Sequence, residues 1–132
     1  MAFTENLFIY KDTLLLCKIL LKYSKTVSKI VRYSTYNEAV SKACAALDMI
    51  RRINVSWTER EERIHEYILL MSEVNSRINL LTDSEFLNKK QATNLNHLAE
   101  KVLREAYGWQ KAEQKRKGES REAVCNTRVP SL

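Results

Sequence analysis

Imidazole side chains are the commonest metal ligands and general bases in proteins, and this chain has two of them, His65 and His97. Glu62, His65 and Glu66 fall on one face of an expected helix, and Glu62 and His65 have the Glu-x-x-His spacing of di-iron helical bundles. Such a centre needs a second Glu-x-x-His pair, and the residue three before His97 is Asn94. The sequence therefore predicts two surface histidines and no metal site.

Motifs for phosphate binding and nucleophilic catalysis are absent from the sequence as well. The two glycines, Gly108 and Gly118, cannot form a Gly-rich phosphate loop, and no Gly-x-Ser-x-Gly or Cys/His pairing is present. The three cysteines, Cys17, Cys44 and Cys125, are scattered, which is typical of reduced thiols in a cytoplasmic protein. We therefore expect a cytoplasmic protein that is not an enzyme and has no cofactor or small-molecule substrate.

One constellation of charged residues does suggest chemistry, and it lies in the first 32 residues. It consists of Lys11, Lys18, Lys22, Lys25, Lys29 and Arg32. On a helix, these spacings of 7, 4, 3, 4 and 3 residues place the cations within a strip about 80° wide that contains no acid. Like charges at such spacing repel each other, whereas a polyanion would turn the repulsion into attraction and release counterions. The alternative is an ordinary solvated helix face.

The rest of the charge distribution is compatible with an anionic partner. The net charge is +6, and residues 1–33 hold six basic but only two acidic residues. Arg51 and Arg52 on the second expected helix extend the candidate nucleic-acid-binding surface. The cluster that follows Trp109 offers a further extension, with Lys111, Lys115, Arg116 and Lys117. No aromatic positions for stacking bases are evident, which favours contacts to the phosphate backbone.

These cations need helices to position them, and composition favours an all-α fold. The first 107 residues contain neither Gly nor Pro, which β-turns and parallel α/β loops require. Apolar periodicity predicts helices at 5–32, 36–54 and 59–81, and a fourth that starts at 83 or near 88. Short loops predict an up-down-up-down four-helix bundle over residues 1–115, followed by a flexible basic tail over 116–132.

Helix starts and apolar faces complete this picture. Thr4 is expected to cap the first helix, and Thr35 and Thr58, each followed three residues later by glutamate, predict capping boxes. Two apolar lines on the first helix suggest one face for the bundle and another for a second subunit. The apolar run 14–21 contains Lys18 and is too short to cross a bilayer, and we expect no signal peptide. Gly108 is expected to admit close helix approach.

Three stretches of the chain carry a resemblance to a known family. The first is the Lys-Tyr-Ser-Lys segment 22–25 followed by residues 28–39, and the second is the Ala-Cys-Ala-Ala-Leu-Asp-Met-Ile-Arg-Arg segment 43–52. The third is 91–111, which ends Tyr107-Gly108-Trp109-Gln110-Lys111. Over residues 7–115 the chain resembles the accessory variability (Avd) proteins of diversity-generating retroelements. These proteins belong to a wider four-helix-bundle family that includes proteins encoded in intervening sequences of bacterial large-subunit ribosomal RNA. The family's glycine near the end of the first helix is missing here.

The resemblance implies a ring-like homopentamer with a basic channel. It also implies two partners, a reverse transcriptase and template-repeat RNA or cDNA. The protein would then be a non-catalytic accessory factor in mutagenic retrohoming, in which adenines are miscopied to diversify a target gene. The alternative is a helical-bundle protein–protein interaction or ribosomal RNA intervening-sequence protein without a nucleic-acid role.

Overall fold

The structure is a computed structural model that describes Thr4 and residues 7–128, with side chains described up to Glu119. Its regular elements are all helical, so the predicted all-α class is confirmed for the described residues. The four long helices are α1 (Phe8–Tyr23), α3 (Asn37–Val55), α4 (Arg60–Asp83) and α5 (Lys89–Arg128).

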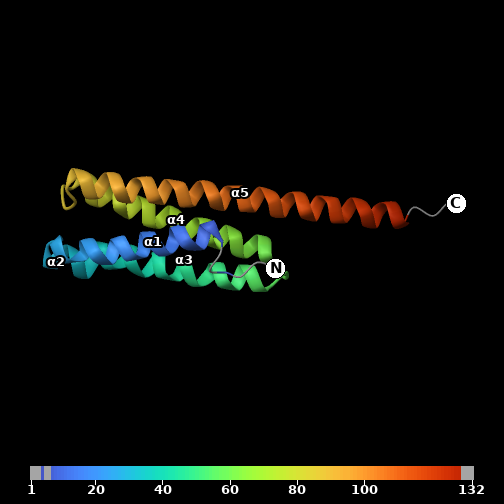
Figure 1. Ribbon diagram of the computed structural model, residues 1–132, viewed down its shortest axis with the longest axis horizontal. Coiled ribbons are helices and arrows are strands. Elements are labelled where there is room, and N and C mark those ends of the chain that lie inside the picture. Colours follow the sequence, from blue (N-terminus) through green and yellow to red (C-terminus); the bar gives the residue numbers. More distant parts are fainter. Residues whose placement is uncertain (1–3, 5–6, 129–132) are drawn as a thin grey trace.

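The long helices lie side by side along the longest axis of the molecule (Figure 1). Helix α1 packs against α3 and α5, and α4 packs against the same two helices, so the four form a bundle. Helix α5 is the longest and continues past the ends of the others (Figure 1). No helix in the described part of the chain is both long and apolar enough to cross a membrane.

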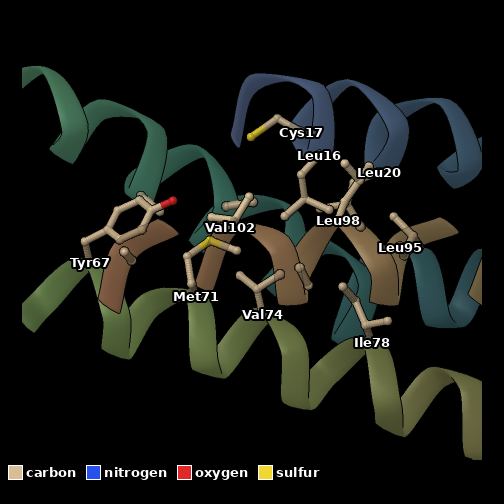
Figure 2. Close-up of a cluster of buried hydrophobic side chains, with 14 of the residues drawn as sticks. Leu16, Cys17, Leu20, Tyr67, Met71, Val74, Ile78, Leu95, Leu98 and Val102 are labelled. Carbon is tan, nitrogen blue, oxygen red and sulfur yellow. The ribbon is translucent and has the colours of Figure 1, made fainter. Parts of the chain in front are cut away.

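The core follows the apolar periodicity of α4. Six residues at 3-4-3-4-3 spacing are at most 2% exposed, as predicted: Ile64, Tyr67, Met71, Val74, Ile78 and Leu81. Figure 2 shows how Met71 and Val74 meet Leu16 of α1 and Val102 of α5. Burying one such side chain contributes about 1.5–3 kcal/mol, so packing along this face of α4 stabilises the bundle.

The first predicted helix is wrong in length, because the chain leaves the helix after Tyr23. A 3-10 turn (Ser24–Thr26), an α-helical turn α2 (Lys29–Val31) and a π-helical segment (Arg32–Tyr36) connect α1 to α3. Val27 is extended at ψ 144° and only 2% exposed, so the break brings its side chain into the core. The side-chain hydroxyls of Ser24 and Thr26 donate to the carbonyls of Leu21 and Tyr23, which caps the end of α1.

The three predicted helix caps are also wrong. Leu7 precedes α1, and Thr4 instead accepts a hydrogen bond of 3.0 Å from Asn54 Nδ2 at the end of α3. The chain kinks at Ser34, where the backbone is non-helical, but no side-chain cap hydrogen bond is formed at the start of the helix that follows. Before α4 the cap is Glu59, in the left-handed region at φ 56°, and it makes no side-chain cap bond.

The start of α5 carries a capping box that the sequence interpretation missed. Gln91 N donates to Asn88 Oδ1 at 2.8 Å, and Asn88 N donates to Gln91 Oε1 at 3.2 Å. Of the two predicted starts for the fourth helix, the one near residue 88 is therefore confirmed. At the other end, α5 remains helical to Arg128, through most of the range predicted as a tail, and residues 129–132 lie outside the described residues.

Candidate nucleic-acid interface

Three of the six predicted cations form a continuous row on α1. Lys11, Lys18 and Lys22 are all exposed, and their spacing of seven and four residues places them on one face. The opposite face of α1 holds the buried Leu16 and Leu20, so the row points away from the core. None of the three forms an ion pair within the described part of the chain. The row is therefore free to meet an external anion.

The other three predicted cations lie beyond the break, so the expected single strip of six is wrong. Lys25 is exposed in the 3-10 turn and Lys29 is exposed in α2. Arg32 is half-buried, and its Nη2 atom donates to the carbonyls of Lys25 at 3.3 Å and Val27 at 3.0 Å. Arg32 therefore holds the broken segment together, while Lys25 and Lys29 add charge at that end of the bundle.

The two predicted arginines of α3 differ in their surroundings. The guanidinium of Arg51 lies 5.7 Å from the ring centroid of Tyr10 on α1, one residue before Lys11. This contact places Arg51 beside the beginning of the lysine row. Arg52 is exposed in the last turn of α3.

A second basic row lies on α5, and of its cations the sequence interpretation names only Lys111 and Lys115. Eight exposed residues at alternating spacings of four and three share one face, and none is acidic: Lys90, Asn94, His97, Lys101, Arg104, Gly108, Lys111 and Lys115. Asn94 donates to Tyr23 Oη at 2.9 Å, and Lys101 Nζ lies 3.4 Å from Asp12 Oδ2, so this row runs beside α1. The neutral residues between the cations hide the row from a search for dense charge, but its spacing is readable from the sequence.

The remaining cations of the predicted C-terminal cluster bind within the protein. Arg116 donates to the carboxylate of Glu113, and Lys117 Nζ lies 2.9 Å from Glu61 Oε2 on α4. Glu113 is buried, and Lys117 is half-buried. The Lys117–Glu61 contact fastens α5 to the start of α4. The Arg116–Glu113 pair lies within α5, and the guanidinium of Arg116 also lies 4.9 Å from the ring centroid of Trp57, just before α4, so both cations have structural roles.

Trp109 has a related structural role. Trp109 packs against the core, and its ring centroid lies 5.8 Å from the guanidinium of Arg60. The same guanidinium lies 4.4 Å from the ring centroid of Trp57. Arg60 is only 8% exposed, and burial lowers the pKa of its guanidinium, while Glu113 opposes this shift. The two indoles and the guanidinium thus join the turn between α3 and α4 to α5.

Gly108 does not admit a close helix approach, contrary to expectation, because a Cβ atom there would meet nothing within 4 Å. A glycine inside a helix destabilises it by roughly 0.5–1 kcal/mol relative to alanine. Gly108→Ala is therefore expected to raise the free energy of unfolding by about 0.5–1 kcal/mol, measured by urea denaturation. The exposed Ala112→Gly is the matched reverse change and should lower it by a similar amount. A destabilised Gly108→Ala protein would contradict this assignment.

Both histidines are exposed. His65 lines an open surface hollow of about 540 Å³ together with Glu62 and Glu66. Within the described residues, no three His, Cys, Asp or Glu side chains are placed to hold a metal ion. The basic rows therefore remain the strongest candidate for a functional surface.

Comparison with known proteins adds no relative to this picture. No family model matches the chain, and no curated protein sequence matches it.

Proposed function

We propose that this chain is a non-catalytic accessory protein that binds nucleic acid through the basic rows of α1 and α5. Its partners are template-repeat RNA or cDNA and the reverse transcriptase of a diversity-generating retroelement, in the cytoplasm, during mutagenic retrohoming. The observation that carries the nucleic-acid part is the row of Lys11, Lys18 and Lys22, which is exposed and has no acidic partner within the described part of the chain. The retroelement part rests on the resemblance of residues 7–115 to Avd proteins.

Charge placement on the two helices supports a phosphate backbone as the ligand. On α3 and α4, two cations are matched by acids: Lys42 pairs with Glu73 at 2.6 Å, and Arg77 pairs with Glu38 at 2.9 Å. On the α1 row no such match occurs among the described residues, so the lysines repel each other until a polyanion neutralises them. Contacts of this kind fix the position of a nucleic acid without reading its sequence.

The proposal includes an up-down-up-down order of the helices and a ring-like homopentamer. Exposed apolar residues on α1 support contacts with a second copy, since Phe8 is 78% exposed and Leu21 is 53% exposed. In such a ring, basic rows from several copies would combine into one channel. Sedimentation that finds only monomer at micromolar concentration would remove the ring from the proposal.

The nucleic-acid proposal is tested by reversing charge on the α1 row. In fluorescence anisotropy with a labelled single-stranded RNA, Lys18→Glu with Lys22→Glu is expected to weaken binding at least about tenfold. Two lost phosphate contacts should also reduce the slope of log affinity against log salt by about 1.4. The matched control is Lys42→Glu with Arg77→Glu, which changes the charge equally on α3 and α4 and should leave binding close to that of the unchanged protein.

Equal binding by the α1 variant and the unchanged protein would reject the assigned surface. Binding that does not depend on salt would favour the alternative, a helical-bundle protein–protein interaction or intervening-sequence protein without a nucleic-acid role. The retroelement part is tested separately in the genome that encodes the chain. A reverse-transcriptase gene and a pair of near-identical repeats are expected beside its gene, and their absence would favour the same alternative.

A further inference from the structure

Two cysteines on neighbouring helices remain outside the proposed function. Cys17 of α1 is buried, Cys44 of α3 is exposed, and both are free thiols. Figure 2 shows Cys17 on α1 at the edge of the core, close to Leu16. The register between α1 and α3 decides whether the Cys44 thiol lies within reach of the Cys17 thiol.

The register between α1 and α3 follows from contacts near both ends of the pair. Asn54 of α3 donates to Thr4, just before α1, whereas Tyr36, just before α3, donates through its hydroxyl to the Leu20 carbonyl near the end of α1. Residue numbers therefore fall along α3 as they rise along α1. The two helices run antiparallel and in contact, as Figure 1 shows.

This register places the two thiols opposite each other. Arg51 of α3 stacks over the ring of Tyr10 on α1, with 5.7 Å between the guanidinium and the ring centroid. Cys17 lies seven residues after Tyr10, and Cys44 lies seven residues before Arg51. Because seven residues are close to two helical turns, the two cysteines repeat the Tyr10–Arg51 contact two turns further along the pair.

The surroundings of Cys17 fit direct contact with Cys44. Burial, followed by the neighbouring Cys44, raises the pKa of the Cys17 thiol to about 12. The other titratable groups that face Cys17 are Asp48 of α3 and Tyr67 of α4. Cys17 is therefore a neutral thiol at neutral pH, and the exposed Cys44 is the sulfur that an oxidant in solution meets first.

We propose that Cys17 and Cys44 form a reversible disulfide when the protein meets hydrogen peroxide. In the first step the Cys44 sulfur attacks one peroxide oxygen, the O–O bond breaks, and a sulfenic acid and one water form. In the second step the Cys17 sulfur attacks the Cys44 sulfur, the S–O bond breaks, and a second water leaves with the thiol proton. Two thiols and one peroxide thus give one disulfide and two waters.

The disulfide would tie α1 to α3 across their irregular connection. The closed loop runs from residue 17 to residue 44 and contains the whole segment 24–36 between the two helices. Cross-linking a loop of this length restricts the unfolded chain, so the oxidised protein is expected to melt several degrees higher than the reduced protein. Lys25 and Lys29, two of the predicted nucleic-acid-binding residues, lie in this segment. The proposed disulfide does not depend on nucleic-acid binding by these two lysines.

The test uses the full chain with Cys125→Ser, so that Cys44 cannot pair with the third cysteine of another copy. After treatment with hydrogen peroxide and alkylation, the intact mass of the monomer should be lower by about 2 Da per disulfide than that of the unoxidised, unalkylated protein. Peptide mapping should find Cys17 linked to Cys44, and dithiothreitol should reverse the link. Dimedone present during oxidation should label Cys44 and leave Cys17 unlabelled.

A shifted cysteine provides the matched control. Cys44→Ser with Ala45→Cys moves the surface thiol by about 100° around α3 to another exposed position. This variant should give disulfide-linked dimers and no internal link. An equally frequent internal link in the shifted variant would overturn the proposal. Oxidation of Cys44 to the sulfinic acid without any link to Cys17 would overturn it as well.

Discussion

Tyr67→Ala is expected to lower the free energy of unfolding by about 4 kcal/mol, measured by urea denaturation followed by circular dichroism. Tyr67 is fully buried in α4, and its ring fills the core between α1, α4 and α5, so alanine would leave a cavity there. Leu69→Ala, on the same helix, is the control. Leu69 is 50% exposed, and its loss should lower the stability by less than about 1 kcal/mol.

The hydroxyl of Tyr67 adds a separate contribution that finer changes isolate. Thr13 Oγ1 donates to the Ile9 carbonyl at 2.6 Å, so the Tyr67 hydroxyl, also 2.6 Å away, must donate to Thr13. Tyr67→Phe should lower stability by about 1 kcal/mol, and Thr13→Val by about 2 kcal/mol, because Val leaves a buried hydroxyl without a partner. The double variant, Tyr67→Phe with Thr13→Val, should lose less stability than the sum of the losses in the two single variants. Strict additivity would contradict the hydrogen bond.

Glu105→Gln is expected to stabilise the protein by about 2 kcal/mol at pH 8 and by little at pH 4.5. Burial, followed by the neighbouring Asp12 carboxylate, raises the pKa of Glu105 from 4.5 to about 7, while Lys101 opposes this shift. Both carboxylate oxygens of Glu105 are buried and accept no hydrogen bond from the described residues. A neutral amide at this position avoids the burial of a charge beside Asp12.

The sign of the pH dependence follows from proton binding. Between pH 4.5 and about 7 the folded state holds a proton on Glu105 that the unfolded chain has released. Stability of the unchanged protein therefore falls as pH rises through this window, and Glu105→Gln should remove that fall. Glu100→Gln, an exposed change on the same helix, should leave the pH profile of stability unaltered. A profile that Glu105→Gln does not change would exclude the assigned carboxyl.

Long helices with regular apolar spacing are predictable from this sequence. The buried residues of α4 follow their 3-4-3-4-3 spacing over the whole helix because one face meets the core throughout. The break after Tyr23 is not predictable in this way, because the apolar spacing continues through it to Val27 and Ile30. Only tertiary contacts decide the outcome there: Val27 is buried, Ile30 is 83% exposed, and Arg32 binds the carbonyls that the break leaves open.

The basic surface was predictable in part for a similar reason. Helical spacing correctly groups Lys11, Lys18 and Lys22, which lie on one uninterrupted helix. It fails for Arg32, which lies beyond a break that the spacing does not reveal. The α5 row shows the opposite case, since its spacing is regular, but only the contacts of Asn94 with Tyr23 and of Lys101 with Asp12 show that it runs beside α1.

The stacking of Arg60 with both indoles determines what optical spectroscopy can report. Trp57 and Trp109 are the two tryptophans of the chain, and both contact the same guanidinium. Intrinsic tryptophan emission therefore reports on the junction between the α3–α4 turn and α5. Opening that begins around α2 will leave this emission unchanged while helical circular dichroism falls. The order in which the two signals change will show which end of the bundle unfolds first.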